Sequence, residues 1–151
     1  NRLAWLTFVT NPKKSQQQVN TIKKKMIKME NLFIEASHFN PAIRFDTQEN
    51  ILEISGDSYD KDFYKPILKW LSQYLRQNRR PLQCNFYLGQ LHSGGLKGLN
   101  EVLCLLEDYN TSTQIPINVN WVSNSENDDT LDYGNDAKEC FDHLAIQVSI
   151  A

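Results

Sequence analysis

The spacing of apolar and polar positions changes several times along the chain, and each change predicts a secondary-structure element. Runs in which apolar residues are adjacent or alternate with polar ones predict strands. Stretches in which apolar residues recur every three or four positions predict amphipathic helices. The predicted strands are residues 32–36, 43–46, 51–54, 82–88, 115–122 and 145–150, and the predicted helices are residues 60–77, 96–110 and 131–141.

Breaking residues mark the ends of these elements. An Asn-Pro pair at 40–41 follows the first strand, a Ser-Gly-Asp segment at 55–57 ends the third, and residues 89–95 predict a turn. The polar turn at 47–50 separates two alternating runs, which is typical of a β-hairpin. Pro66 fits only the first turn of a helix, so we expect that helix to begin within residues 60–63.

The order of the elements predicts the fold class. Three strands come first, and the later strands alternate with helices, as in an α/β protein whose helices pack on a mixed sheet. A length of 151 residues suits one domain. We therefore expect a single α/β domain with a mixed sheet of about six strands and about three packed helices.

Charge is distributed unevenly along the chain. Residues 1–28 contain seven Lys or Arg and no Asp or Glu, whereas residues 29–151 contain 9 basic and 18 acidic side chains, and the sum is the formal −2. We therefore expect a basic, flexible N-terminal extension at 1–28 and a folded domain at 29–151. The acidic domain is a poor ligand for phosphate backbones, so no nucleic-acid partner is expected.

Several further classes of protein are excluded. No apolar run approaches the roughly 18 residues that a membrane span needs, so no membrane insertion is expected. Residues 3–9 are apolar but too few, with no small-residue cleavage site after them, for a signal peptide. The chain begins with Asn, so the first residues are interpreted as a fragment or a translated leader, with Met26 or Met29 as the natural start. Three cysteines are too few for a disulfide-built domain, so we expect reduced thiols and a cytoplasmic location.

Motifs for catalysis, metals and nucleotides are incomplete. Gly89 and Gly94 have the spacing of a phosphate-binding loop, but the Lys and Ser or Thr that this loop requires do not follow. Cys140 and His143 have the spacing of half a metal site, but no second pair follows, so we interpret them as a cysteine at a helix end and a surface histidine. His92 precedes Ser93 with no carboxylate identifiable to orient it as a base. We therefore expect no catalytic residue, no metal and no cofactor.

Ser93 is the one hydroxyl whose position suggests a role. It follows a predicted strand and precedes a predicted helix, where a serine is expected as the N-cap. One interpretation is that Ser93 only caps the helix. The other is that it accepts a phosphoryl group, which the helix dipole and Lys97 would favour, with Gly94 and Gly95 leaving space beside it.

Five segments of the chain match a known family in their order and spacing. They are the opening strand at 29–34, the second strand at 41–46, a Gly-acid-Ser-Tyr element within 52–59, the helix segment at 70–75 and the late strand at 119–121. Together they resemble the SiaC family of bacterial biofilm-regulating phosphoproteins, and the similarity covers residues 29–151.

This resemblance implies a fold like that of anti-sigma-factor antagonists and a signalling role. A protein kinase and a metal-dependent protein phosphatase would act on the protein, and its unphosphorylated form would bind and activate a diguanylate cyclase. The family's acceptor segment, Asn-Thr-Ser-Ser-x-Lys, aligns with residues 92–97, so Ser93 takes the acceptor position and Lys97 keeps its place. The resemblance also assigns His92, Gly94, Gly95 and Lys97 to phosphate or partner binding.

The expected function is therefore that of a non-enzymatic signalling adaptor switched at Ser93. Two alternatives stay open. The first is a constitutive adaptor in which Ser93 only caps the helix. The second is an enzyme or small-ligand-binding domain with a pocket at the strand ends.

Overall fold

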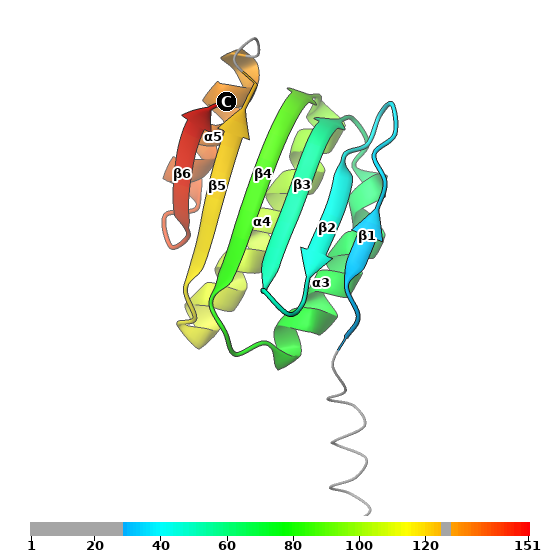
Figure 1. Cartoon of the computed structure of the whole chain (residues 1–151). Coiled ribbons are helices and arrows are strands. Elements are labelled where there is room, and N and C mark those ends of the chain that lie inside the picture. The colour runs from blue at the N-terminus through cyan, green and yellow to red at the C-terminus, as the bar shows by residue number, and fades with distance from the viewer. Residues whose placement is uncertain (1–28, 125–127) are drawn as a thin grey trace, which may run out of the picture.

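A computed structural model describes residues 29–124 and 128–151 and has the predicted α/β order (Figure 1). Within these described residues, six strands form one sheet, with three α-helices and one 3₁₀ turn. The elements are β1 (Leu32–Ile34), β2 (Ala42–Asp46), β3 (Ile51–Ser58), the 3₁₀ turn η1 (Asp62–Tyr64), α3 (Lys65–Gln77), β4 (Leu82–Leu91), α4 (Ser93–Thr113), β5 (Ile117–Ser123), α5 (Asp128–Cys140) and β6 (Ala145–Ile150).

The strands lie in the sheet in their order along the chain, from β1 to β6. The pairs β1–β2 and β2–β3 are antiparallel, whereas β3–β4, β4–β5 and β5–β6 are parallel. The predicted mixed sheet and the predicted β2–β3 hairpin are therefore confirmed. Each parallel connection carries one helix, and Figure 1 shows the helices behind the sheet.

One face of the sheet forms the hydrophobic core against these helices. The inward residues alternate along each strand, as in β3, where Leu52 and Ile54 are at most 1 % exposed. The opposite face is solvated and carries exposed side chains such as Arg44 and Asn118. Pro66 lies in the first turn of α3, as predicted, but the α-helix begins at Lys65, later than the predicted start within residues 60–63, because the 3₁₀ turn η1 occupies Asp62–Tyr64.

The predicted end of the third strand is wrong. β3 continues through the Ser-Gly-Asp segment to Ser58, and Gly56 is accommodated at a φ of 119° where the β3–β4 register shifts. A residue with a side chain rarely adopts this φ, so glycine here permits an irregular strand rather than ending it.

The predicted turn at 89–95 is also wrong. β4 runs on to Leu91 because parallel pairing with β3 continues to the Ser58–Leu91 pair. A Cβ atom at Gly89 would lie 2.1 Å from Asp57 Oδ1, so this glycine leaves room for the Asp57 carboxylate, which accepts the Gln90 N–H at 2.7 Å. The following helix, α4, also extends to Thr113, three residues beyond its predicted end.

The predicted N-terminal extension, residues 1–28, lies outside the described residues. Within the described part of the chain, no helix combines the length and apolar character needed to cross a membrane. All three cysteines are free thiols, as predicted.

Candidate functional site

Ser93 is the first residue of α4 and is exposed to solvent. The prediction that Ser93 is the N-cap is wrong by one residue, because His92 occupies the N-cap with extended backbone angles. The first helical turn closes through the Leu96 N–H, which donates to the His92 carbonyl at 2.8 Å. Ser93 thus belongs to the first turn of α4, where the backbone N–H groups have no carbonyl of a preceding helical turn as an acceptor. This turn is the positive end of the helix dipole.

Gly94 and Gly95 set how closely α4 approaches the end of β3. A Cβ atom at Gly94 would lie 2.4 Å from the Tyr59 carbonyl oxygen, and one at Gly95 would lie 2.2 Å from the Ser58 carbonyl oxygen. Gly95 is buried and Gly94 is half-buried. These glycines therefore fix the position of Ser93 through packing, and Gly95 is not part of the exposed surface.

Two lysines lie near the start of α4. Lys97 is exposed and one turn after Ser93, on the same side of the helix. The Lys61 backbone nitrogen would be 3.2 Å from a Cβ at Gly94, and the Lys61 side chain forms a 3.5 Å ion pair with Glu101. A negative group on Ser93 would thus have the Lys97 side chain one turn away, whereas the Lys61 ammonium is paired with Glu101 two turns further along α4.

An aromatic cluster made of Phe39, Tyr59 and His92 adjoins Ser93. The rings of Tyr59 and His92 stack with centroids 3.9 Å apart and an interplanar angle of 20°. Phe39 meets the Tyr59 ring edge-on at 5.4 Å and is 63 % exposed. Exposed aromatic groups of this kind are enriched at protein-binding surfaces.

Backbone and side-chain hydrogen bonds hold the aromatic cluster in place. The His92 N–H donates to the Ser58 carbonyl, and the Tyr59 N–H donates to the Phe39 carbonyl, both at 2.9 Å. The Tyr59 hydroxyl donates to Gln90 Oε1 at 2.8 Å. The cluster is thus anchored to the ends of β3 and β4, so that its rings are oriented before any partner binds.

Below this surface, Ser58 and Tyr64 share a buried hydrogen bond of 2.8 Å. Burial raises the pKa of Tyr64 to about 12, and the hydrogen bond to Ser58 opposes part of that shift. Tyr64 therefore stays neutral, and its ring packs against Gly98 of α4. This contact supports the first two turns of the helix from inside the core.

No sequence pattern marks Phe39 or Lys61 as a site residue, and Tyr59 stands out only within the resemblance. Tyr59 and Lys61 follow β3 and come close to the start of α4 because the ends of the parallel strands β3 and β4 meet at one edge of the sheet. Phe39 lies between β1 and β2 and is joined to them by the Tyr59 N–H, which donates to its carbonyl. The signal that could have found them is this topology, since strands that enter parallel crossovers end on the same side.

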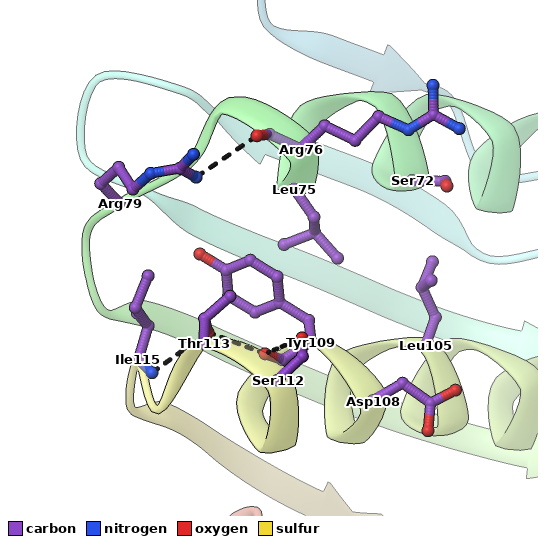
Figure 2. Close-up of a pocket in the computed structure, with 10 residues that line it drawn as sticks. All are labelled: Ser72, Leu75, Arg76, Arg79, Leu105, Asp108, Tyr109, Ser112, Thr113 and Ile115. Carbon is purple, nitrogen blue, oxygen red and sulfur yellow. Dashed lines mark hydrogen bonds between the residues drawn. The ribbon is translucent and has the colours of Figure 1, made fainter.

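Two hollows bear on the alternative of a ligand-binding domain. A groove of about 530 Å³ lies between the C-terminal halves of α3 and α4 (Figure 2). Leu75 and Leu105 point into it, and Arg76 and Asp108 lie at its margins. The groove is next to Thr113 and thus at the opposite end of α4 from Ser93.

The second hollow, of about 460 Å³, lies at the carboxyl ends of β3, β4 and β5. Asp57 is the one carboxyl side chain among its described lining residues, and its Oδ1 accepts the Gln90 N–H at 2.7 Å. Across residues 29–124 and 128–151, no group of three or more His, Cys, Asp and Glu is placed to hold a metal ion.

Comparisons with known proteins agree with this fold. A model of the SiaC family of regulatory phosphoproteins matches residues 34–150. An uncharacterized protein of Pseudomonas aeruginosa strain UCBPP-PA14 is 28 % identical over 123 residues, which cover 79 % of this chain and 97 % of that protein.

Solved structures are similar at lower identity. Apo-SiaC from Pseudomonas aeruginosa superposes with a TM-score of 0.67 at 22 % identity, covering 81 % of this chain and 98 % of that one. A chain in the complex of diguanylate cyclase SiaD with its activator SiaC, from the same organism, gives a TM-score of 0.71 at 22 % identity, covering 80 % and 99 %. The family match spans most of the chain, and this protein therefore belongs to the SiaC family of regulatory phosphoproteins.

Proposed function

We propose that this protein is a non-enzymatic signalling adaptor whose partner binding is switched by reversible phosphorylation of Ser93. The unphosphorylated form would bind and activate a diguanylate cyclase, and a protein kinase and a metal-dependent phosphatase would set the balance between the two forms. Membership of a regulatory phosphoprotein family supports this proposal. So does the likeness to a complex in which SiaC is the activator of the cyclase SiaD.

The observation that carries the proposal is the exposed Ser93 hydroxyl at the first residue of α4. A phosphoserine there would carry a charge of about −1.5 to −2. The N-terminal N–H groups of the helix favour such a charge by about 0.3–1 kcal/mol, and Lys97 adds a cation one turn away. The phosphorylated form is thus compatible with the fold.

The effect of the phosphate on binding follows from the adjoining surface. Phe39, Tyr59 and His92 offer an aromatic contact that a partner would cover and dehydrate. A dianion at its border would have to lose water on complex formation without a compensating cation from the partner. Phosphorylation is therefore expected to weaken the complex while leaving the adaptor folded.

The test compares Ser93→Ala and Ser93→Asp in a binding titration with the cognate diguanylate cyclase. We expect the alanine variant to bind as the wild type does and the aspartate variant to bind at least about tenfold more weakly, since each tenfold is about 1.4 kcal/mol. Ser112→Asp is the matched control, because Ser112 is exposed on the same helix and about 28 Å away along its axis.

Intact-mass measurement with the cognate kinase tests the modification itself. We expect a single phosphoryl addition that Ser93→Ala abolishes. An unchanged mass, or a phosphoryl group on another residue, would overturn the switch at Ser93. Equal binding of the cyclase by the alanine and aspartate variants would instead identify a constitutive adaptor.

A further inference from the structure

The strand β6 is an edge of the sheet, and no described strand of the chain pairs with its outer side. Its six residues, Ala-Ile-Gln-Val-Ser-Ile, include no charged residue and no proline. Edge strands of monomeric proteins are usually protected by charge, proline, a bulge or short length. The opposite edge, β1, has such protection, because it is three residues long and Glu30 and Glu35 lie close to its ends.

The hydrogen-bonding direction of β6 follows from its pairing with β5. The Ala151 N–H donates to the Ser123 carbonyl at 2.9 Å, and the parallel register pairs Ile150 with Ser123. Because successive residues of a strand direct their backbone groups to opposite sides, residues 145, 147 and 149 also face β5. The backbone groups of Ile146, Val148 and Ile150 therefore face away from the sheet.

The pattern of apolar and polar residues in β6 is symmetric about Val148. An antiparallel pairing of two copies with Val148 opposite Val148 places Ile146 opposite Ile150 and Gln147 opposite Ser149. The aliphatic pairs then lie on the helix-covered side of the sheet, and the neutral polar pairs lie on the solvated side. No pair brings like charges together, and Ile150, 55 % exposed in one copy, is covered by the other.

We propose that β6 is a self-association surface, which pairs antiparallel with β6 of a second copy of this chain about a two-fold axis at Val148. The two Val148 residues exchange N–H···O bonds, and each Ile150 N–H donates to the Ile146 carbonyl of the other copy. The Ile146 N–H contributes less, because it already donates to the Leu144 carbonyl at 3.1 Å. This association joins two sheets into one and does not depend on the phosphorylation of Ser93.

A single strand pair covers less area than the roughly 1,200–2,000 Å² of a standard interface, so we expect a reversible dimer with micromolar affinity. Sedimentation velocity of the full chain over a micromolar concentration series measures this directly. The weight-average sedimentation coefficient should rise with concentration from the monomer value towards the dimer value. A monomer at every concentration would overturn the proposal.

Charge variants test the register. In the proposed register, residue 147 of each copy lies opposite residue 149 of the other. The double variant Gln147→Lys/Ser149→Lys therefore creates two lysine–lysine pairs in the dimer, and we expect the dissociation constant to rise about tenfold or more. The double variant Gln147→Glu/Ser149→Lys places opposite charges in the same pairs and should restore dimer formation. Both positions are exposed, so neither variant disturbs the core.

The matched control is Asn118→Lys, which adds a lysine to the solvated face of β5 instead of the edge strand. It should leave the dissociation constant unchanged. A dimer that resists the double-lysine variant, or that the Glu/Lys variant fails to restore, would place the contact elsewhere and contradict this pairing.

Discussion

At the scale of single residues, the start of α4 depends on glycines that have no room for a side chain. In the sequence, Gly94 and Gly95 are expected to leave space beside Ser93. The structure gives them an additional and more direct role, since a Cβ atom on either would meet the backbone of Ser58 or Tyr59. A backbone atom cannot move aside as a flexible side chain can, so the cost of adding a methyl group is high.

The variant Gly95→Ala tests this role. Alanine in place of glycine within a helix normally stabilises a protein by about 0.5–1 kcal/mol. Here the added Cβ would lie 2.2 Å from the Ser58 carbonyl oxygen, so we expect the free energy of unfolding to fall by about 1–3 kcal/mol. Urea denaturation measures the change. Lys97→Ala, an exposed position on the same helix, should change stability by no more than about 0.5 kcal/mol. A stabilised Gly95→Ala variant would contradict the close packing.

At the scale of elements, the turn between β2 and β3 is tied to the end of α3. Asn50 has a positive φ of 61°, and its side-chain amide donates to the Pro81 carbonyl at 2.8 Å and to Asn78 Oδ1 at 3.2 Å. The buried Tyr74 hydroxyl donates to Asn50 Oδ1, and Asn78 Nδ2 donates to the Tyr109 hydroxyl at 2.9 Å. One polar network therefore joins the hairpin, α3 and α4.

Two substitutions of Asn50 separate the contribution of its side-chain hydrogen bonds from that of its backbone conformation at positive φ. Asn50→Ala loses the network and also strains the backbone at positive φ, and we expect it to lower the free energy of unfolding by about 2–4 kcal/mol. Asn50→Gly loses the same hydrogen bonds without the backbone strain, so it should be about 1 kcal/mol less destabilising. Chemical denaturation measures both values.

The control for the Asn50 variants is Gln114→Gly. Gln114 has a similar φ of 63° but is exposed at the end of α4, so glycine there should leave stability unchanged or raise it by up to about 1 kcal/mol. If Asn50→Gly were as stable as the wild type, the network would contribute nothing to the fold.

At the scale of the whole molecule, the core is one continuous layer between the sheet and its helices. Cys84 lies at its centre on β4, fully buried, and burial raises the pKa of its thiol well above the usual range. Cys104 and Cys140 are exposed. The three thiols therefore report on different parts of the molecule.

Alkylation of Cys84 should report global unfolding. In a Cys104→Ser/Cys140→Ser background, we expect Cys84 to react only through the unfolded state, because no smaller opening exposes the central strand. The free energy obtained from its rate of modification should equal that from urea denaturation. A markedly smaller value would show that β4 opens locally, and this would contradict a single cooperative core.

The sequence by itself determined the order and type of the elements, because the period of apolar residues reports which face of each element is buried. It also placed Ser93 between a strand and a helix, and it predicted the mixed sheet that the structure confirms. It predicted the ends of β3 and β4 wrongly, because Gly56 and Gly89 look like turn residues until the pairing of the two strands is known.

Tertiary structure alone decided what surrounds Ser93. Tyr59 and His92 stack across a separation of 33 residues because the parallel pairing of β3 and β4 brings their ends together. It also decided that His92, and not Ser93, is the N-cap, since the helix begins where β4 stops pairing with β3. Local patterns encode burial and turn preference, whereas contacts between distant segments depend on how the strands are paired, and no local pattern contains that information.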